Sequence, residues 1–268
     1  MLSKVFSFAR TLKHGTHIKF RDRETAALIL TSVLKDKVKN IEDPKKQVLV
    51  LGIPRGGIIM AKKISEKLGC SFDFIVPLRL VAPNDHELSI GAVMSDSTIT
   101  YLNMSLIEEL GIEDSYLNKE KEKKLKEINE KTRKYLSSQN NKKYNNNYIN
   151  DVNSTGMLEE NGGYLLKYSN RCKLVILIDD GVFSGASIIV AARWIIKNLS
   201  PPKVIVSSPI IPKEIIPTIK HETVKSIDVV SLISPSINRF KNVGNYYINY
   251  LPVNDDEVMK CLGKNNYG

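Results

Sequence analysis

The sequence predicts an α/β fold, a mostly parallel twisted sheet flanked by helices. Two apolar segments, 47–52 and 173–178, are rich in β-branched residues, and each leads into a glycine-containing turn and then a helical pattern. Fully apolar strands are typical of parallel sheets, because helices cover both of their faces. Strands and helices go on alternating toward the C-terminus, which favours a parallel α/β arrangement. The chain has 268 residues, so we expect a single domain over 1–268 with room for an insertion.

The elements of the first half follow from local signals. Apolar residues at helical spacing predict helices, a short β-branched run predicts a buried strand, and Gly69 marks a helix end. Asp114 or Ser115 would cap a long charged helix over 115–136. In chain order we predict a helix at 26–38, a strand at 47–52, a helix at 58–68, a strand at 72–77, a hairpin of 89–93 with 98–102, and this charged helix.

Residues 137–170 differ from their surroundings. Six asparagines lie between positions 138 and 150, and glycine-containing turns follow. Such a segment offers little apolar surface to offset the entropy of ordering, so we predict a flexible Asn-rich insertion at 137–170.

The second half returns to strong patterns, and two prolines, Pro201 and Pro202, stop one of its helices. The acids that follow Asn254 suit the first turn of a terminal helix. We predict a strand at 173–178, a helix at 185–199, a strand at 204–207, a helix at 212–220, a strand at 227–232 and a helix from 254.

Charge and cysteine content limit the classes of function. The formal charge of +10 attracts anions, either nucleic acid or small phosphorylated substrates. The three cysteines are scattered, which suits a reducing cytoplasm and argues against a zinc site. No apolar run reaches the length of a membrane-spanning helix. We expect a cytoplasmic protein with no membrane partner.

The end of the strand at 173–178 carries the strongest functional signal. Asp179 and Asp180 follow it, and a loop of small and hydroxylated residues then opens a helix. Unpaired N–H groups at a helix N-terminus suit a phosphate, whereas carboxylates suit the hydroxyls of an attached sugar. We therefore favour a pentose 5-phosphate site over a generic strand end with acids. Its phosphate loop would be Gly181, Val182, Phe183, Ser184, Gly185, Ala186 and Ser187.

A second strand end lies at Ile53-Pro54-Arg55-Gly56-Gly57. Its backbone N–H groups and the guanidinium of Arg55 suit a second phosphate group, and Arg79 would add positive charge to the same place. Taken alone, the turn could equally be a surface turn with a solvated arginine. Arg79 could equally belong to a surface ion pair.

Together these motifs resemble the type I phosphoribosyltransferases. Residues 175–187 are similar to their signature for phosphoribosyl pyrophosphate (PRPP), and 53–57 to their pyrophosphate loop. The resemblance narrows to predicted phosphoribosyltransferases of undetermined base specificity, because 20–24, 76–93 and 243–247 also look like stretches of that group.

The resemblance implies roles residue by residue. The candidate catalytic residues are Asp179 and Asp180, facing the ribose hydroxyls, and Arg55. Arg55, Gly56, Gly57 and Arg79 would bind pyrophosphate, in a loop that commonly holds a non-proline cis peptide. Mg²⁺ would be the cofactor, held mostly by substrate and water, with no metal-ligating residue assigned.

Three departures from the usual pattern are visible. Ser184 and Ser187 stand in place of threonine, and Arg79 in place of lysine, so hydroxyls and charge are kept. Phe183 stands where the 6-oxopurine enzymes have an aspartate, which argues against hypoxanthine or guanine. The phenyl ring would stack on an aromatic base or serve in the core or a lid.

The implied activity exchanges the pyrophosphate of PRPP for a nitrogenous base, as in nucleotide salvage or synthesis. The main alternative is a non-catalytic regulator that binds PRPP or a nucleotide. A hydrolase using Asp179 as nucleophile is least favoured, because Gly181 stands where it would want an acid. The expected partners are PRPP and the base, without nucleic acid. Dimers are common among similar proteins, so a homodimer is one expected assembly, and base recognition would come from a small hood at the chain ends.

Overall fold

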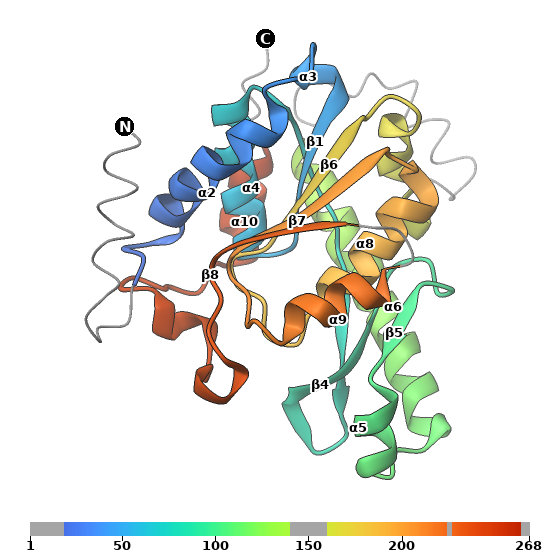
Figure 1. Ribbon diagram of the computed structural model, residues 1–268. Coiled ribbons are helices and arrows are strands. Elements are labelled where there is room, and N and C mark those ends of the chain that lie inside the picture. The colour runs from blue at the N-terminus through green and yellow to red at the C-terminus, as the bar shows by residue number, and fades with distance from the viewer. Residues whose placement is uncertain (1–18, 140–159, 224–226, 264–268) are drawn as a thin grey trace.

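A five-stranded parallel sheet forms the centre of the molecule (Figure 1). The computed structural model describes residues 19–139, 160–223 and 227–263. The strands lie in the order β2-β1-β6-β7-β8, and every neighbouring pair is parallel. Their bounds are β1 Val48–Gly52, β2 Ser71–Phe74, β6 Leu174–Ile178, β7 Lys203–Ile210 and β8 Asp228–Ile233.

The strand order reverses at β1. The chain first steps from β1 outward to β2, and then returns to the other side of β1 with β6, so that Gly52 pairs with Ile178. In open α/β sheets, a crevice forms outside the carboxyl ends of the strands at such a reversal, and ligands bind there. Both loops singled out in the sequence follow these two strands.

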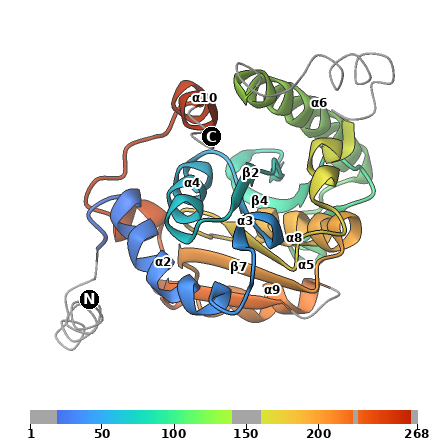
Figure 2. The same ribbon diagram turned by 90° about the horizontal axis from the view of Figure 1, so that it is seen from above.

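Helices cover both faces of the sheet (Figure 2). Alternate residues of each strand face opposite sides, and they build two apolar clusters. One lies under α2 (Arg23–Val38), α4 (Gly56–Leu68) and α10 (Asp255–Gly263), the other under α8 (Ala186–Leu199) and α9 (Ile215–Glu222). Trp194 of α8 is among the largest fully buried side chains. None of the described helices is long and apolar enough to cross a membrane.

A small antiparallel sheet, β3-β4-β5, extends from the main body. It contains β3 (Leu78–Ala82), β4 (Asp85–Val93) and β5 (Thr100–Leu102), followed by α5 (Met104–Glu109) and the long α6 (Asp114–Gln139). The hydroxyl of Tyr135 in α6 donates to Asp255 at 2.8 Å, which joins α6 to α10. The short elements are α3 Pro44–Gln47, η2 Glu160–Tyr168, η3 Ile237–Arg239 and η4 Val243–Tyr246.

The predicted fold class is confirmed, and the predicted strands and helices lie within a few residues of the observed ones. The elements that were not predicted are β3, α3, α5 and the three short helices η2, η3 and η4. The predicted flexible insertion at 137–170 is too wide at both ends. Residues 137–139 belong to α6, residues 160–168 form η2, and the central 140–159 lie outside the described residues.

Asp73 of β2 fixes both ends of that segment. Its side chain is buried, and its carboxylate pairs with Lys167 at 2.9 Å and accepts a hydrogen bond from the hydroxyl of Tyr168 at 3.1 Å. Gln139, at the end of α6, also donates to it, at 3.4 Å. A charge this deeply buried is tolerated only when it is paired and hydrogen-bonded. Asp73 is therefore an anchor for both flanks of the undescribed residues.

We predict that Asp73→Ala lowers the free energy of unfolding by roughly 2–4 kcal/mol, because it leaves several partners of a buried charge unsatisfied. Urea denaturation followed by circular dichroism measures this change. Lys167→Gln is the control and should cost about 1 kcal/mol or less, since the lysine is partly exposed. Equal losses in the two variants would contradict an anchoring role for Asp73.

Candidate functional site

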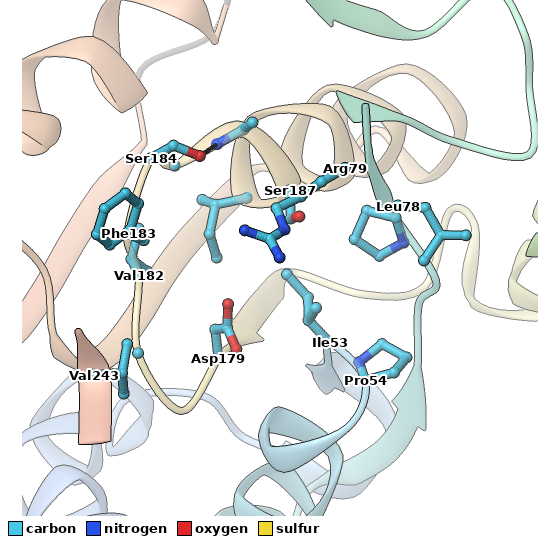
Figure 3. Close-up of a pocket in the computed structure, with 15 residues that line it drawn as sticks. Ile53, Pro54, Leu78, Arg79, Asp179, Val182, Phe183, Ser184, Ser187 and Val243 are labelled. Atoms are coloured by element: carbon cyan, nitrogen blue, oxygen red, sulfur yellow. Dashed lines mark hydrogen bonds between the residues drawn. The ribbon is translucent and has the colours of Figure 1, made fainter. Parts of the chain in front are cut away.

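A cavity of about 300 Å³ lies at the carboxyl ends of β1 and β6 (Figure 3). Four segments contribute to it: the turn after β1, the start of β3, the loop between β6 and α8 with the first turn of α8, and the start of η4. Its lining residues are Ile53, Pro54, Pro77, Leu78, Arg79, Asp179, Gly181, Val182, Phe183, Ser184, Gly185, Ala186, Ser187, Ile188 and Val243. All seven residues of the predicted phosphate loop belong to this lining.

The loop between β6 and α8 has the geometry of an anion site. Gly185 is the residue that caps α8 and has a φ of 78°, a conformation that favours glycine. Gly185 has no side chain to cap the helix, and the first N–H group of α8, that of Ala186, donates only a long hydrogen bond of 3.4 Å to the Ser184 hydroxyl. Ser187 adds a second hydroxyl to the lining.

The side chain of Asp179 points into this cavity, toward the guanidinium of Arg79 (Figure 3). Burial and the neighbouring charge of Asp180 raise the pKa of the Asp179 carboxyl well above its ordinary value. The backbone N–H of Asp180, which donates to Asp179 at 2.8 Å, and the charge of Arg79 oppose this shift. Asp179 is thus a half-buried acid facing the cavity, where hydroxyls and cations would stabilise its ionised form.

The turn after β1 lies directly against the end of β6. A Cβ atom on Gly57 would come within 2.6 Å of the Ile178 carbonyl oxygen, so a larger residue would push the two loops apart. The peptide bond between Pro54 and Arg55 is cis, the feature that the resemblance implied for this loop. The predicted pyrophosphate loop and phosphate loop are therefore immediate neighbours.

The four residues predicted to bind pyrophosphate do not all reach the cavity. Arg79 lines the cavity, whereas Arg55, Gly56 and Gly57 lie outside its lining. Arg55 is exposed at the start of α4. Burial raises the pKa of Asp255, but the hydrogen bond from Tyr135 and nearby charges, including that of Arg55, outweigh it and lower the pKa. The charge of Arg55 therefore acts on Asp255, at the start of α10.

Asp180 is held by residues that sequence reasoning did not assign to the site. Its Oδ2 atom accepts hydrogen bonds from Arg23 Nε at 2.6 Å and from the Tyr250 hydroxyl at 3.1 Å, and its carbonyl oxygen accepts one from Tyr247 at 2.7 Å. Asp180 is outside the cavity lining. The two adjacent acids therefore have different surroundings. The sequence contained one indication of these contacts. Arg23 and Tyr247 lie in the stretches 20–24 and 243–247, which resemble the same group of phosphoribosyltransferases.

Phe183 is exposed over 46% of its surface and lines the cavity. Its ring packs against Phe240 at a centroid distance of 5.6 Å, and Phe240 in turn stacks on Tyr246. This aromatic row gives Phe183 a structural support, and its use as a stacking surface for a base stays a prediction.

The described residues contain no group of three or more His, Cys, Asp or Glu side chains that could hold a metal ion. Of the two adjacent acids, only Asp179 faces the cavity, while Asp180 is engaged by Arg23. This donor set fits a metal held chiefly by a ligand's oxygens and water, as the resemblance implied for Mg²⁺.

The fold and this cavity define an α/β protein with a pocket at the carboxyl ends of its central strands, and comparisons with known proteins add what the chain resembles. No family model matches the chain. Two proteins from Mycobacterium tuberculosis strains CDC 1551 and H37Rv, named "Putative phosphoribosyl transferase MT0597" and "Putative phosphoribosyl transferase Rv0571c", are each 25% identical over 219 residues. The match covers 82% of this chain but 42% of theirs, so the chain spans less than half the length of these relatives.

A solved structure matches more of its length. The crystal structure of TT1426 from Thermus thermophilus has a TM-score of 0.63 and 25% identity, and the match covers 92% of this chain and 99% of that one. The chain thus has the fold expected from the sequence. It resembles phosphoribosyltransferases of unspecified base, in agreement with the motifs.

We predict that Asp179→Asn raises the melting temperature at pH 8 and leaves it nearly unchanged at pH 4. The pKa of Asp179 is higher in the folded than in the unfolded chain, so ionising it costs stability as the pH rises above about 4. Asparagine does not ionise and avoids this cost. Differential scanning fluorimetry in phosphate-free buffers measures it.

Asp228→Asn is the control of opposite sign. The Asp228 pKa is lowered, mainly by the hydrogen bond from Lys203, so its ionised form stabilises the fold above the ordinary value. Asp228→Asn should lower the melting temperature slightly at pH 8, and this difference should disappear as the pH falls. A stabilising effect of Asp179→Asn at pH 4 equal to that at pH 8 would contradict the assignment.

Proposed function

We propose that this protein transfers the phosphoribosyl group of PRPP to a nitrogenous base in a Mg²⁺-dependent reaction. The observation that carries this proposal is the pairing of an open helix N-terminus with a single inward-facing acid, Asp179, across a cavity of about 300 Å³. The loop suits the 5-phosphate, and the acid suits the ring hydroxyls. The names of the Mycobacterium tuberculosis relatives support the class of reaction.

The proposed chemistry is a displacement at the anomeric carbon. A nitrogen of the base forms a bond to C1, the bond from C1 to the pyrophosphate oxygen breaks with its electron pair, and the nitrogen loses its proton to solvent. Positive charge develops on the ribose ring and negative charge on the departing group. In this proposal Asp179 favours the cationic ring, and Arg79 with the backbone N–H groups stabilises the anion.

Mg²⁺ would supply neutralising charge at the pyrophosphate. Asp179 is the cavity residue that would help to hold it, together with oxygens of the ligand and water. No dedicated protein nucleophile is needed, because the base attacks directly.

A non-catalytic PRPP or nucleotide sensor is the second candidate. One observation favours it: Arg55 lies outside the cavity lining, and its charge is felt at Asp255. Binding without turnover would be the signature of such a sensor.

The direct test is isothermal titration of the purified protein with PRPP, with Mg²⁺ and with EDTA. We expect binding at least ten-fold tighter with Mg²⁺, because the metal neutralises the pyrophosphate. Pyrophosphate release would then be measured with a panel of free purine, pyrimidine and pyridine bases. Binding without release from any base would support the sensor, and absence of binding in both conditions would overturn both candidates.

We predict different ligand dependence for the two arginines. Arg79→Gln should weaken both PRPP and ribose 5-phosphate about ten-fold or more, because Arg79 lines the cavity beside Asp179. Arg55→Gln should weaken PRPP alone, because ribose 5-phosphate lacks the pyrophosphate. Titration of each variant with both ligands measures this, and an equal loss of both ligands in Arg55→Gln would exclude it as a pyrophosphate contact.

A further inference from the structure

The two acids of the signature face different parts of the molecule. Asp179 points into the cavity, toward Arg79 (Figure 3). Asp180 is paired with Arg23, and the two side chains retain only 12% and 13% of their exposure. A Cβ atom on Gly56 would lie 2.0 Å from Asp180 Oδ2, so the glycine makes room for this carboxylate. The second acid therefore fills a fitted position of its own.

The partners of Asp180 come from both ends of the chain. Arg23 begins α2, donates a second hydrogen bond to the Leu251 carbonyl oxygen at 2.7 Å, and lies 4.0 Å above the centre of the Tyr250 ring. Tyr250 and Tyr247 donate to the side chain and the backbone of Asp180. One residue at the end of β6 thus ties together an N-terminal and a C-terminal segment.

The same two segments are joined by backbone hydrogen bonds. The N–H of Phe20 donates to Tyr246, and the N–H of Ile248 donates back to Phe20, each at 2.8 Å. Asn249 N–H donates to Arg21 at 2.8 Å. Residues 20–23 and 243–251 are therefore held together, and we call them the chain-end unit. The contacts to Asp180 attach this unit to the loop after β6.

The unit also supplies part of the cavity wall. Val243 lines the cavity a few residues before Tyr246. It lies so close to Gly181 that a Cβ there would come within 2.2 Å of a Val243 methyl carbon. A displacement of the chain-end unit would therefore move Val243 and change the shape of the phosphate loop.

We propose that Asp179 and Asp180 have separate tasks: Asp179 alone contacts the ribose, while Asp180, Arg23 and Tyr250 form a clamp that positions the cavity wall. The inference rests on the proposed function, because it assigns parts of the same site. Arg23 and Tyr250 both bind the Oδ2 atom of Asp180, and Asp180 lies outside the cavity lining, so Asp179 is the acid that a ribose in the cavity would meet. Arg23 and Tyr250 are positioning residues that act through Asp180.

A double-mutant cycle tests the clamp. Arg23→Gln, Asp180→Asn and the double variant would be titrated with ribose 5-phosphate, after circular dichroism has shown that each is folded. Because both single changes break one clamp, we expect each to weaken binding several-fold and the double variant to be no weaker than the worse single variant. Effects that multiply, or a loss in Asp180→Asn without one in Arg23→Gln, would place Asp180 in contact with the ligand and overturn the proposal.

If those variants fail to fold, two less disruptive substitutions test the clamp instead. Tyr250→Phe removes one hydroxyl but keeps the ring beneath Arg23, and it should weaken ribose 5-phosphate about three-fold. Tyr246→Phe is the matched control from the same segment; among the described residues no partner is found for its hydroxyl. Equal affinities of Tyr250→Phe and the unmodified protein would count against the clamp.

The pH dependence of binding separates positioning from a general loss of structure. The charged or titratable groups near Asp179 are Asp180, Arg79 and Tyr247, with Arg23 behind Asp180. Removing the negative charge of Asp180 should move the pH midpoint of binding downward, and removing the positive charge of Arg23 should move it upward. The ligand phosphate titrates identically in all variants and cancels in the comparison.

Shifts in the same direction would contradict separate roles. The unmodified protein distinguishes failure of the clamp from failure of the proposed function: if it binds neither ribose 5-phosphate nor PRPP, both proposals are overturned, whereas a binding protein with independent Arg23 and Asp180 overturns the clamp alone.

Discussion

The close approach of two strand ends, β1 and β6, is the constraint on which the rest of the site depends. Gly52 pairs with Ile178, and a Cβ on Gly52 would come within 2.5 Å of the Ile58 Cα atom. Gly57 meets the Ile178 carbonyl oxygen in the same way. Because there is no room for side chains here, α4 starts directly against the end of β6, and the loops that follow the two strands border one cavity.

This arrangement has an electrostatic consequence. Two acids follow β6 in succession, of which Asp180 is buried and Asp179 half-buried. Asp180 receives a guanidinium and a phenol as permanent partners, whereas Asp179 faces Arg79 across an open cavity. Asp179, which has no ion pair as close as that of Asp180, is thus the acid that lies where a bound ligand would supply a partner. Binding sites commonly retain such a locally unfavourable group, and the surrounding fold offsets its cost.

The sequence predicted those parts of the fold whose signals are local. Apolar β-branched runs and glycine turns identified β1, β6 and the loops after them, because a buried parallel strand and a helix start leave their mark within a few residues. Strand β3 was missed because it follows Pro77 directly and pairs with β4 through an irregular register. Because the register is irregular, the sequence of β3 shows no regular alternation of apolar and polar residues that would identify it as a strand.

The same limit explains what was missed in the site. Arg23 and Asp180 are 157 residues apart, and neither position reveals the other. The motif predicted that both acids would face the ligand, because adjacent carboxylates at a strand end look equivalent in one dimension. In the folded chain, successive residues leave a strand in opposite directions. One acid therefore reaches the cavity, and its neighbour reaches the face where the two chain ends meet.

That geometry makes the chain ends part of the site. Val243 and Gly181 touch at the cavity wall, and Tyr247 and Tyr250 attach the same C-terminal segment to Asp180. A loop rich in glycine and serine has little side-chain packing of its own to fix its shape. The contacts from the chain ends supply that packing at the end of β6. The shape of the cavity therefore depends on residues far from the loop between β6 and α8 in sequence, and these residues act through packing and hydrogen bonds at Gly181 and Asp180.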